Sequence, residues 1–236
     1  MHDMSDDRKA LAILAHDLKA PLSAIIDLLG VIEKGYVSDI NKTRDLVARA
    51  SQKAETLIKM VDDILDCAVP SNNSKMKRET LRIFDILKES IHTVKPFADS
   101  RNITLTYHPE LWGERFVSGN YTFLLRVFNN ILMNAIKYNK EIGQISIDCA
   151  EDIESKNISI RIRDTGVGIP EDEIDQVFDV FERGRYAGKN IDGSIGLGLS
   201  LVREIVKDHE GKVNLTSKVG EGTTVTITLP YMPRKK

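Results

Sequence analysis

The spacing of apolar residues over the first 68 positions constrains the fold more than any other feature of the chain. Apolar side chains recur there at steps of three and four, the repeat of one face of an α-helix. A first run follows Leu11, Leu14, Leu18, Leu22, Ile25, Leu29 and Ile32, and a second follows Leu46, Val47, Ala50, Leu57, Met60, Val61, Ile64 and Leu65. The pattern predicts two long helices, of which Gly35 ends the first and either Ser38 or Asp39 caps the second.

Two such helices with a short connection form an antiparallel hairpin. A hairpin cannot bury the apolar stripes of both helices by itself, so it needs a partner. The simplest partner is a second copy of the chain, which gives a four-helix bundle with two-fold symmetry. The sequence therefore predicts a homodimer that assembles through the hairpin.

The helical repeat stops at residues 69–78, which are rich in Pro, Ser and Asn. Beyond them, helices at 83–99, 120–139 and 197–210 alternate with strands at 103–107, 144–150, 157–163, 212–216 and 223–229. Helices interleaved with mostly antiparallel strands favour an α/β sandwich, in which a helical layer covers one sheet. The chain is thus predicted to be α+β, with one domain over residues 1–69, a linker over 70–75 and a second domain over 76–236.

Composition excludes several classes of partner. The 33 Lys and Arg residues against 35 Asp and Glu give a formal net charge of −2, which provides no general attraction to nucleic acid or to anionic lipid. The most apolar stretch, Ala24–Ile32, contains Asp27 and is far shorter than the roughly 20 residues of a membrane span. The first residues lack the pattern of a signal peptide, and Cys67 and Cys149 cannot form a disulfide framework. We therefore expect a cytoplasmic segment without membrane contact.

The first chemical signal is a histidine inside the first predicted helix, followed five positions later by a proline. Pro21 removes a backbone donor and crowds the preceding turn, at a cost of about 3 kcal/mol. Lys19 and Ala20 lie on the same helical face as His16, and the carboxylate of Asp17 can hold a proton on the imidazole. A lone histidine in a helix is more often a surface or core residue, but the proline favours a functional one.

The predicted helix over residues 120–139 places two amides on one face. Asn130 and Asn134 are four residues apart, and Lys137 follows three residues later. Amide oxygens are hard ligands that suit Mg²⁺, and a lysine supplies a point charge for phosphate. The alternative is a polar helix edge.

Two glycine-rich segments are the remaining candidates for ligand binding. Asp164–Pro170 follows a predicted strand, and Gly193–Leu199 precedes a predicted helix whose amides can bind phosphate. Neither segment matches the Rossmann fingerprint or the Walker P-loop. These residues therefore indicate another way of holding a nucleotide.

Taken in order, the segments resemble the catalytic core of the sensor histidine kinases of two-component signalling. The six similar boxes are His16–Pro21 (H box), Asn130–Tyr138 (N box), Asp164–Gly168 (first glycine box), Phe178–Arg183 (F box), Gly196–Leu199 (second glycine box) and Gly220–Thr223 (last glycine box). They follow the family order and span nearly the whole chain, which makes the match specific.

The resemblance implies a dimerisation and histidine-phosphotransfer domain followed by a Bergerat-type ATP-binding domain. It implies ATP and Mg²⁺ as cofactors, autophosphorylation of His16 with Asp17 as the proton acceptor, and transfer of the phosphoryl group to an aspartate in the receiver domain of a response regulator. Asp164 then binds the adenine amino group, and Asn134 ligates Mg²⁺ with Asn130 beside it.

The remaining nucleotide contacts implied by the resemblance are Lys137 and Arg183 at the phosphates, Tyr138 near the nucleoside, and Gly166, Gly168, Gly196, Leu197, Gly198 and Thr223 around the ligand. Residues 183–195 correspond to the lid over ATP. The chain contains no input domain, so we expect either a short kinase or the cytosolic part of a membrane-bound sensor.

Some positions depart from the family. Many relatives carry Thr or Asn where this chain has Ala20, and such a side chain orients the water that dephosphorylates the regulator, so we expect weak or absent phosphatase activity. Glu182 in the F box and Ile195 before Gly196 are also unusual. Two rival functions remain: an ATPase of the same fold, disfavoured because Asn130 stands where those enzymes carry a glutamate base, and a nucleotide-sensing scaffold without kinase activity.

The other histidines and most aromatic residues are expected to serve the fold. We interpret His2, His92, His108 and His209 as surface or packing residues, and Trp112, Phe84, Phe97 and Phe128 as core residues.

Overall fold

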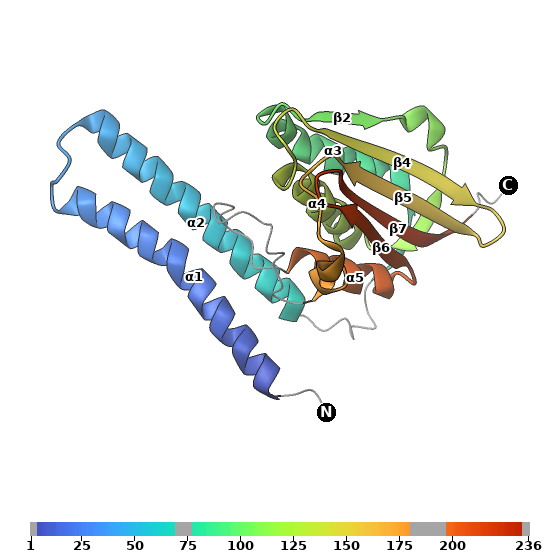
Figure 1. Cartoon of the computed structure of the whole chain (residues 1–236), viewed down its shortest axis with the longest axis horizontal. Helices are drawn as coiled ribbons and strands as arrows, with labels where there is room; N and C mark the ends of the chain where they lie inside the picture. The colour runs from blue at the N-terminus through green and yellow to red at the C-terminus, as the bar shows by residue number, and fades with distance from the viewer. Residues whose placement is uncertain (1–3, 69–76, 180–196, 233–236) are drawn as a thin grey trace.

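The computed structural model describes residues 4–68, 77–179 and 197–232. They form a long helical hairpin and a mixed α/β domain, and Figure 1 shows the two with helix α5 of the α/β domain near helix α2 of the hairpin. No helix within these ranges is long and apolar enough to cross a membrane.

The hairpin consists of α1 (Met4–Glu33) and α2 (Ile40–Ala68). Gly35 follows α1 with φ 67°, a left-handed conformation that glycine adopts without strain. The carboxylate of Asp39 accepts hydrogen bonds from the amides of Asn41 (2.7 Å) and Lys42 (3.3 Å), so Asp39 rather than Ser38 caps α2. Pro21 lies inside α1, as the sequence requires.

The α/β domain contains a seven-stranded sheet in the order β1-β3-β7-β5-β4-β2, and β6 also pairs with β7. Its elements are β1 (Glu79–Arg82), α3 (Ile83–Asp99), β2 (Thr104–Tyr107), β3 (Phe116–Gly119), α4 (Tyr121–Lys137), β4 (Gln144–Asp152), β5 (Asn157–Asp164), α5 (Gly198–Asp208), β6 (Lys212–Lys218) and β7 (Gly222–Met232), with 3₁₀ turns at 109–111, 171–173 and 176–178. The pairing of β2 with β4 is parallel, and the other pairings are antiparallel.

The core lies between the sheet and the layer of α3, α4 and α5 (Figure 1). On β5, Ile158, Ile160 and Ile162 are buried and alternate with the exposed Arg161 and Arg163, because successive side chains of a strand point to opposite faces. Each fully buried isoleucine contributes about 1.5–3 kcal/mol. This packing fixes the end of β5 next to the end of α4, where the candidate site lies.

The predicted helices and the five predicted strands are present, with ends that differ by a few residues. Two strands of four residues, β1 and β3, were missed because, unlike β2, they show no alternation of apolar and polar residues. Trp112 is buried as expected, but Phe97 is 52% exposed, so its assignment to the core was wrong. Phe97 lies near the end of α3, on the face that the sheet does not cover.

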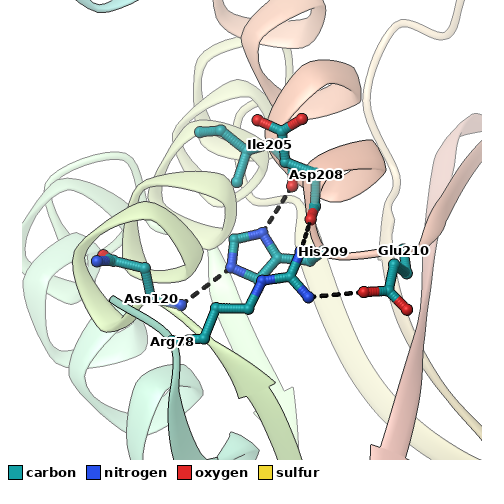
Figure 2. A network of polar contacts seen from close by, with 6 residues as sticks. All are labelled: Arg78, Asn120, Ile205, Asp208, His209 and Glu210. Carbon is teal, nitrogen blue, oxygen red and sulfur yellow. Dashed lines mark hydrogen bonds and ion pairs between the residues drawn. The ribbon is translucent and has the colours of Figure 1, made fainter. Parts of the chain in front are cut away.

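His209 links the end of α5 to the start of α4 by hydrogen bonds (Figure 2). Its Nε2 accepts a hydrogen bond from the amide of Asn120 at 3.0 Å, and its Nδ1 lies 2.7 Å from the carbonyl oxygen of Ile205. Arg78 donates to the carbonyl oxygen of Asp208 and to the Glu210 carboxylate, the latter at 2.7 Å. His209 is therefore a packing residue, and it holds together two helices that both contribute to the site.

Candidate active site

Asp164, the last residue of β5, is a buried carboxylate with an unusual division of its hydrogen bonds. The amides of Gly166 (2.8 Å) and Thr223 (3.1 Å) both donate to the same oxygen, Oδ1. Burial raises the pKa of Asp164 above its ordinary value, although both amide bonds act in the opposite direction. This arrangement leaves Oδ2 as an acceptor for a donor group of a ligand.

Three loops close around this carboxylate, and glycines make the close approach possible. A Cβ atom on Gly166 would lie 2.4 Å from the carbonyl oxygen of Tyr138, and one on Gly222 would lie 2.1 Å from that of Asp164. Gly168 has φ +72°, and a Cβ there would lie 2.1 Å from the Lys218 oxygen. The loops after α4, β5 and β6 thus pack backbone against backbone, and a larger residue at any of these three positions would separate them.

Hydrogen bonds join the same loops. The amide of Val167 donates to the Tyr138 carbonyl at 3.0 Å, and the amide of Gly220 donates to the Val167 carbonyl at 2.8 Å. Lys140 donates through Nζ to the carbonyl of Gly220. The wall around Asp164 is therefore held by backbone contacts as well as by close packing.

The two asparagines of α4 face the start of α5. Asn130 and Asn134 are half-buried, and a Cβ atom on Gly198 would lie 3.5 Å from Oδ1 of Asn130 and 4.0 Å from Nδ2 of Asn134. The N-terminus of a helix presents amides that have no acceptor within the helix, together with the positive end of the helix dipole. Amide oxygens beside such a helix end fit a phosphate chain that carries Mg²⁺.

Lys137 and Tyr138 lie at the other end of this face of α4. The ammonium of Lys137 lies 5.3 Å from the centre of the Tyr138 ring. Arg101 donates to the carbonyl oxygens of Ile136 (2.8 Å) and Lys137 (2.9 Å), and so caps the end of α4. The sequence analysis did not identify Arg101, because its role depends on the contact between α3 and α4.

His16 is exposed on α1, and the surface beside it is hollowed. A groove of about 390 Å³ runs along the hairpin and is lined by Ala15, Leu18, Lys19, Leu22, Leu57 and Val61. The groove places apolar side chains and one ammonium group near the histidine.

Leu197, in the second glycine box, connects the two parts of the molecule. It is 2% exposed and forms a small apolar cluster with Met60, against which Leu14, Leu18 and Ile64 pack. Leu14 and Leu18 precede and follow His16 by two residues on α1. The residue just before α5 therefore packs against the hairpin, in a cluster to which residues on both sides of His16 contribute.

Part of the predicted site lies outside the described residues. This part comprises Arg183, Gly196 and the lid at 183–195, and the side chain of Asp17 is not described either. Of the F box, Phe178 and Asp179 are described: Arg203 of α5 lies 3.5 Å from the Asp179 carboxylate and 5.8 Å from the centre of the Phe178 ring. The described part of the F box thus packs against α5.

Two further polar groups support the loops, and sequence reasoning missed both. The hydroxyl of Thr165 accepts from the amide of Gln144 (2.9 Å) and donates to Oδ1 of Asn139 (3.2 Å). Ser217 of β6 makes a similar set of contacts on the other side of Asp164. The only sequence signal for Ser217 is a hydroxyl at a core-facing position of a strand.

Comparisons with known proteins agree with this geometry. Residues 6–68 match the His Kinase A (phospho-acceptor) domain, and residues 119–233 match the histidine kinase-, DNA gyrase B-, and HSP90-like ATPase. The sensor protein kinase WalK of Staphylococcus haemolyticus is 27% identical over 98% of this chain, which spans 39% of WalK. The chain thus spans between 38% and 57% of the length of the curated relatives it matches.

Solved structures share the fold. Histidine kinase AdeS of Acinetobacter baumannii superposes with a TM-score of 0.71 and 19% identity, over 91% of this chain and 97% of that one. Histidine kinase ThkA, solved in complex with the response regulator protein TrrA, also gives a TM-score of 0.71, with 20% identity over 97% of this chain and 65% of that one. With a phospho-acceptor domain followed by an ATPase domain, the chain belongs to the family of sensor histidine kinases.

Proposed function

We propose that this chain is an ATP-dependent protein-histidine kinase that phosphorylates His16. The observation that carries the proposal is the position of the start of α5, which lies beside the asparagine pair of α4 and, through Leu197, against the hairpin that carries His16. In the reaction, a ring nitrogen of His16 forms a bond to the γ-phosphorus of ATP, the bond to the bridging oxygen breaks, and ADP leaves. Asp17 accepts or stabilises the proton on the other ring nitrogen.

The base of the nucleotide binds at Asp164. Its Oδ2 accepts a hydrogen bond from the amino group of adenine, because the amides of Gly166 and Thr223 occupy Oδ1. The ring of Tyr138 packs near the nucleoside, and Gly166 and Gly168 allow the base to approach the backbone.

The phosphates lie between α4 and the start of α5. Asn134, with Asn130 beside it, holds Mg²⁺, which neutralises phosphate charge. Lys137 and Arg183 bind the phosphate oxygens, and residues 183–195 form the lid over ATP, with Gly196 and Gly198 as its hinges.

Phosphoryl transfer to His16 is favoured over hydrolysis of ATP. An amide is a poor general base, and Asn130 occupies the place at which ATPases of this fold carry a glutamate. Asn130 is also half-buried against α5, which is a suitable position for a ligand or a structural contact but not for activation of water.

We further propose a homodimer through the hairpin. Leu22, Ile26 and Leu29 share one face of α1 and are 47%, 61% and 48% exposed, while Val47, Ile58 and Val61 form a similar face on α2. A contiguous apolar face of this kind marks an interaction surface. A receiver domain of a response regulator then docks at the hairpin near His16 and takes the phosphoryl group on an aspartate.

The domain boundaries stay as the sequence predicts them: 1–69, a linker over 70–75, and 76–236. The start of the second domain is supported by β1, which begins at Glu79 and pairs with β3 in the sheet. The ATPase family match begins only at residue 119.

The test is incubation with γ-labelled ATP and Mg²⁺, with His16→Gln beside the native chain. His92→Gln is the matched control, because His92 is an exposed histidine on α3. We expect acid-labile, base-stable label on the native chain and on His92→Gln, and none on His16→Gln.

Label on His16→Gln would place the acceptor elsewhere and contradict the proposal. ATP binding without label on any of the three proteins would support a nucleotide-sensing scaffold instead.

A further inference from the structure

Ser217 occupies a position on β6 where the strand pattern calls for an apolar residue. The side chains of Val213, Leu215 and Ser217 alternate with exposed neighbours and are themselves half-buried. The first two pack against the hydrophobic core, as expected for the inner face of a sheet. A hydroxyl at the third position needs polar partners, and the structure supplies three.

The Ser217 hydroxyl joins two glycine-rich loops. It accepts a hydrogen bond from the amide of Ile169 at 2.8 Å, donates to the carbonyl oxygen of Gly222 at 2.9 Å, and lies 2.9 Å from Oγ1 of Thr223. Ile169 belongs to the loop after Asp164, whereas Gly222 and Thr223 begin β7. Ser217 and Thr223 are directly opposite each other in the β6–β7 ladder, which explains why the two hydroxyls meet.

These contacts fix the direction of the bond between the two hydroxyls. A serine hydroxyl has one proton to donate and two lone pairs that accept. The carbonyl oxygen of Gly222 can only accept, so both contacts are satisfied together only when Ser217 donates to Gly222 and Thr223 donates to Ser217. Thr223 has then used its only hydroxyl proton, and its lone pairs can serve only as acceptors.

Thr223 in turn orients Asp164, because its amide donates to Oδ1 of that carboxylate at 3.1 Å. Ser217 therefore acts on Asp164 from two sides: through Thr223, and through the loop that contains Ile169. It touches neither the carboxylate nor, in the site described above, the nucleotide.

We propose that Ser217 is a positioning residue that makes the site select a 6-aminopurine over a 6-oxopurine. It keeps Asp164 in place and prevents the Thr223 hydroxyl from donating, so that the site presents acceptors to the base. An amino group can satisfy these acceptors, but a carbonyl oxygen cannot. The inference rests on the proposed function, in which Asp164 binds the base of ATP.

The experiment measures the dissociation constants of ATP and of inosine triphosphate for the full chain by calorimetry. Inosine triphosphate has the same sugar and phosphates, but it carries a carbonyl group in place of the amino group. For Ser217→Ala we expect ATP binding to weaken by about two- to tenfold, the range for loss of one hydrogen bond. Inosine triphosphate binding should stay the same or improve, so the preference for ATP falls.

Two variants serve as controls. Ser217→Thr keeps the hydroxyl and should restore the preference, and Thr216→Ala removes a hydroxyl from the exposed neighbouring position and should leave both constants unchanged. Thermal unfolding of each variant verifies that it is folded, and Ser217→Cys, which keeps the size of the side chain but replaces the hydroxyl by a weakly hydrogen-bonding thiol, provides the test if Ser217→Ala unfolds.

The binding results distinguish an error in the role of Ser217 from an error in the proposed function. If Ser217→Ala weakens both nucleotides equally, or neither, while the native chain prefers ATP, Ser217 has no role in base selection and the proposed function stands. If the native chain itself binds the two nucleotides equally, recognition of the base by Asp164 is wrong, and the role of Ser217 falls with it.

Discussion

At the scale of single residues, Asp164 combines a buried position with a fixed orientation. Two backbone amides donate to its Oδ1, so in Asp164→Asn the amide oxygen takes that place and the NH₂ group takes the place of Oδ2. An acceptor for the base then becomes a donor. We expect ATP to bind about 10- to 100-fold more weakly, the range for a hydrogen bond to a charged group, and inosine triphosphate to bind no more weakly than before.

A measurement of thermal stability distinguishes this loss of ATP binding from misfolding of the variant. Burial raises the pKa of Asp164, which means that its ionised form is disfavoured in the fold, and a neutral asparagine avoids that cost. The melting temperature of Asp164→Asn at pH 7 should therefore be no lower than that of the native chain. Equal weakening of both nucleotides would show that Asp164 does not read the base.

Sequence reasoning finds residues whose chemistry is visible in local spacing and misses those that act across strands. His16, Asn130, Asn134 and Asp164 stand in recognisable boxes. Ser217 was missed because its partners come from two other loops, and their meeting depends on the register of β6 with β7. Local spacing carries no information about that register.

At the scale of elements, the joint between α5 and α4 depends on a neutral histidine. Burial lowers the pKa of His209 below its ordinary value of 6.5, and the nearby guanidinium of Arg78 acts in the same direction. The Asp208 and Glu210 carboxylates and the hydrogen bond to Ile205 oppose the shift but do not cancel it. Protonation would also remove the acceptor for the Asn120 amide (Figure 2).

This shift predicts a dependence of stability on pH. Because the folded-state pKa is lowered, the unfolded chain binds a proton that the folded chain does not, so the contribution of His209 is complete above pH 6.5 and is lost as the pH falls below that value. We expect the free energy of unfolding in urea to fall between pH 7.5 and 5.5 more steeply for the native chain than for His209→Gln. The other histidines are common to both proteins, and parallel pH profiles would contradict the prediction.

The elements that the sequence predicts well are those with long periodic patterns. The helices of the hairpin and α3 have clear repeats and recognisable ends, such as Gly35 after α1. The four-residue strands β1 and β3 show no alternation of apolar and polar residues, and they form because each pairs with a neighbour in the sheet. Whether such segments form strands depends on their pairing in the folded sheet, which a single sequence does not show.

At the scale of the whole molecule, the order of the domains follows from the sequence, but the contact between them does not. The small cluster of Leu197 and Met60 brings the start of α5 to the hairpin, and neither residue has a spacing that predicts it. Leu197 was selected as a nucleotide contact because of its place in a glycine box. The structure adds that its side chain is buried against the hairpin.

The hairpin also determines the assembly of the molecule. Ile26 is 61% exposed at the centre of the apolar face of α1, between Leu22 and Leu29. If a second copy covers this face, Ile26→Glu places a charge in a desolvated interface, which costs several kcal/mol unless the charge is paired. We expect this variant to sediment as a monomer at concentrations at which the native chain sediments as a dimer.

Ile153→Glu is the matched control for this change. Ile153 is 75% exposed, but it lies in the turn between β4 and β5, away from the hairpin, so the same substitution should leave the dimer intact. A native chain that sediments as a monomer, or an Ile26→Glu variant that stays dimeric, would contradict a dimer built on this face. A monomeric Ile26→Glu variant also shows which protomers take part in the reaction. Label on its His16 would mean that one protomer supplies both the nucleotide site and the histidine. Loss of label, restored on mixing with a dimer-competent chain, would mean that the site and the histidine come from different protomers.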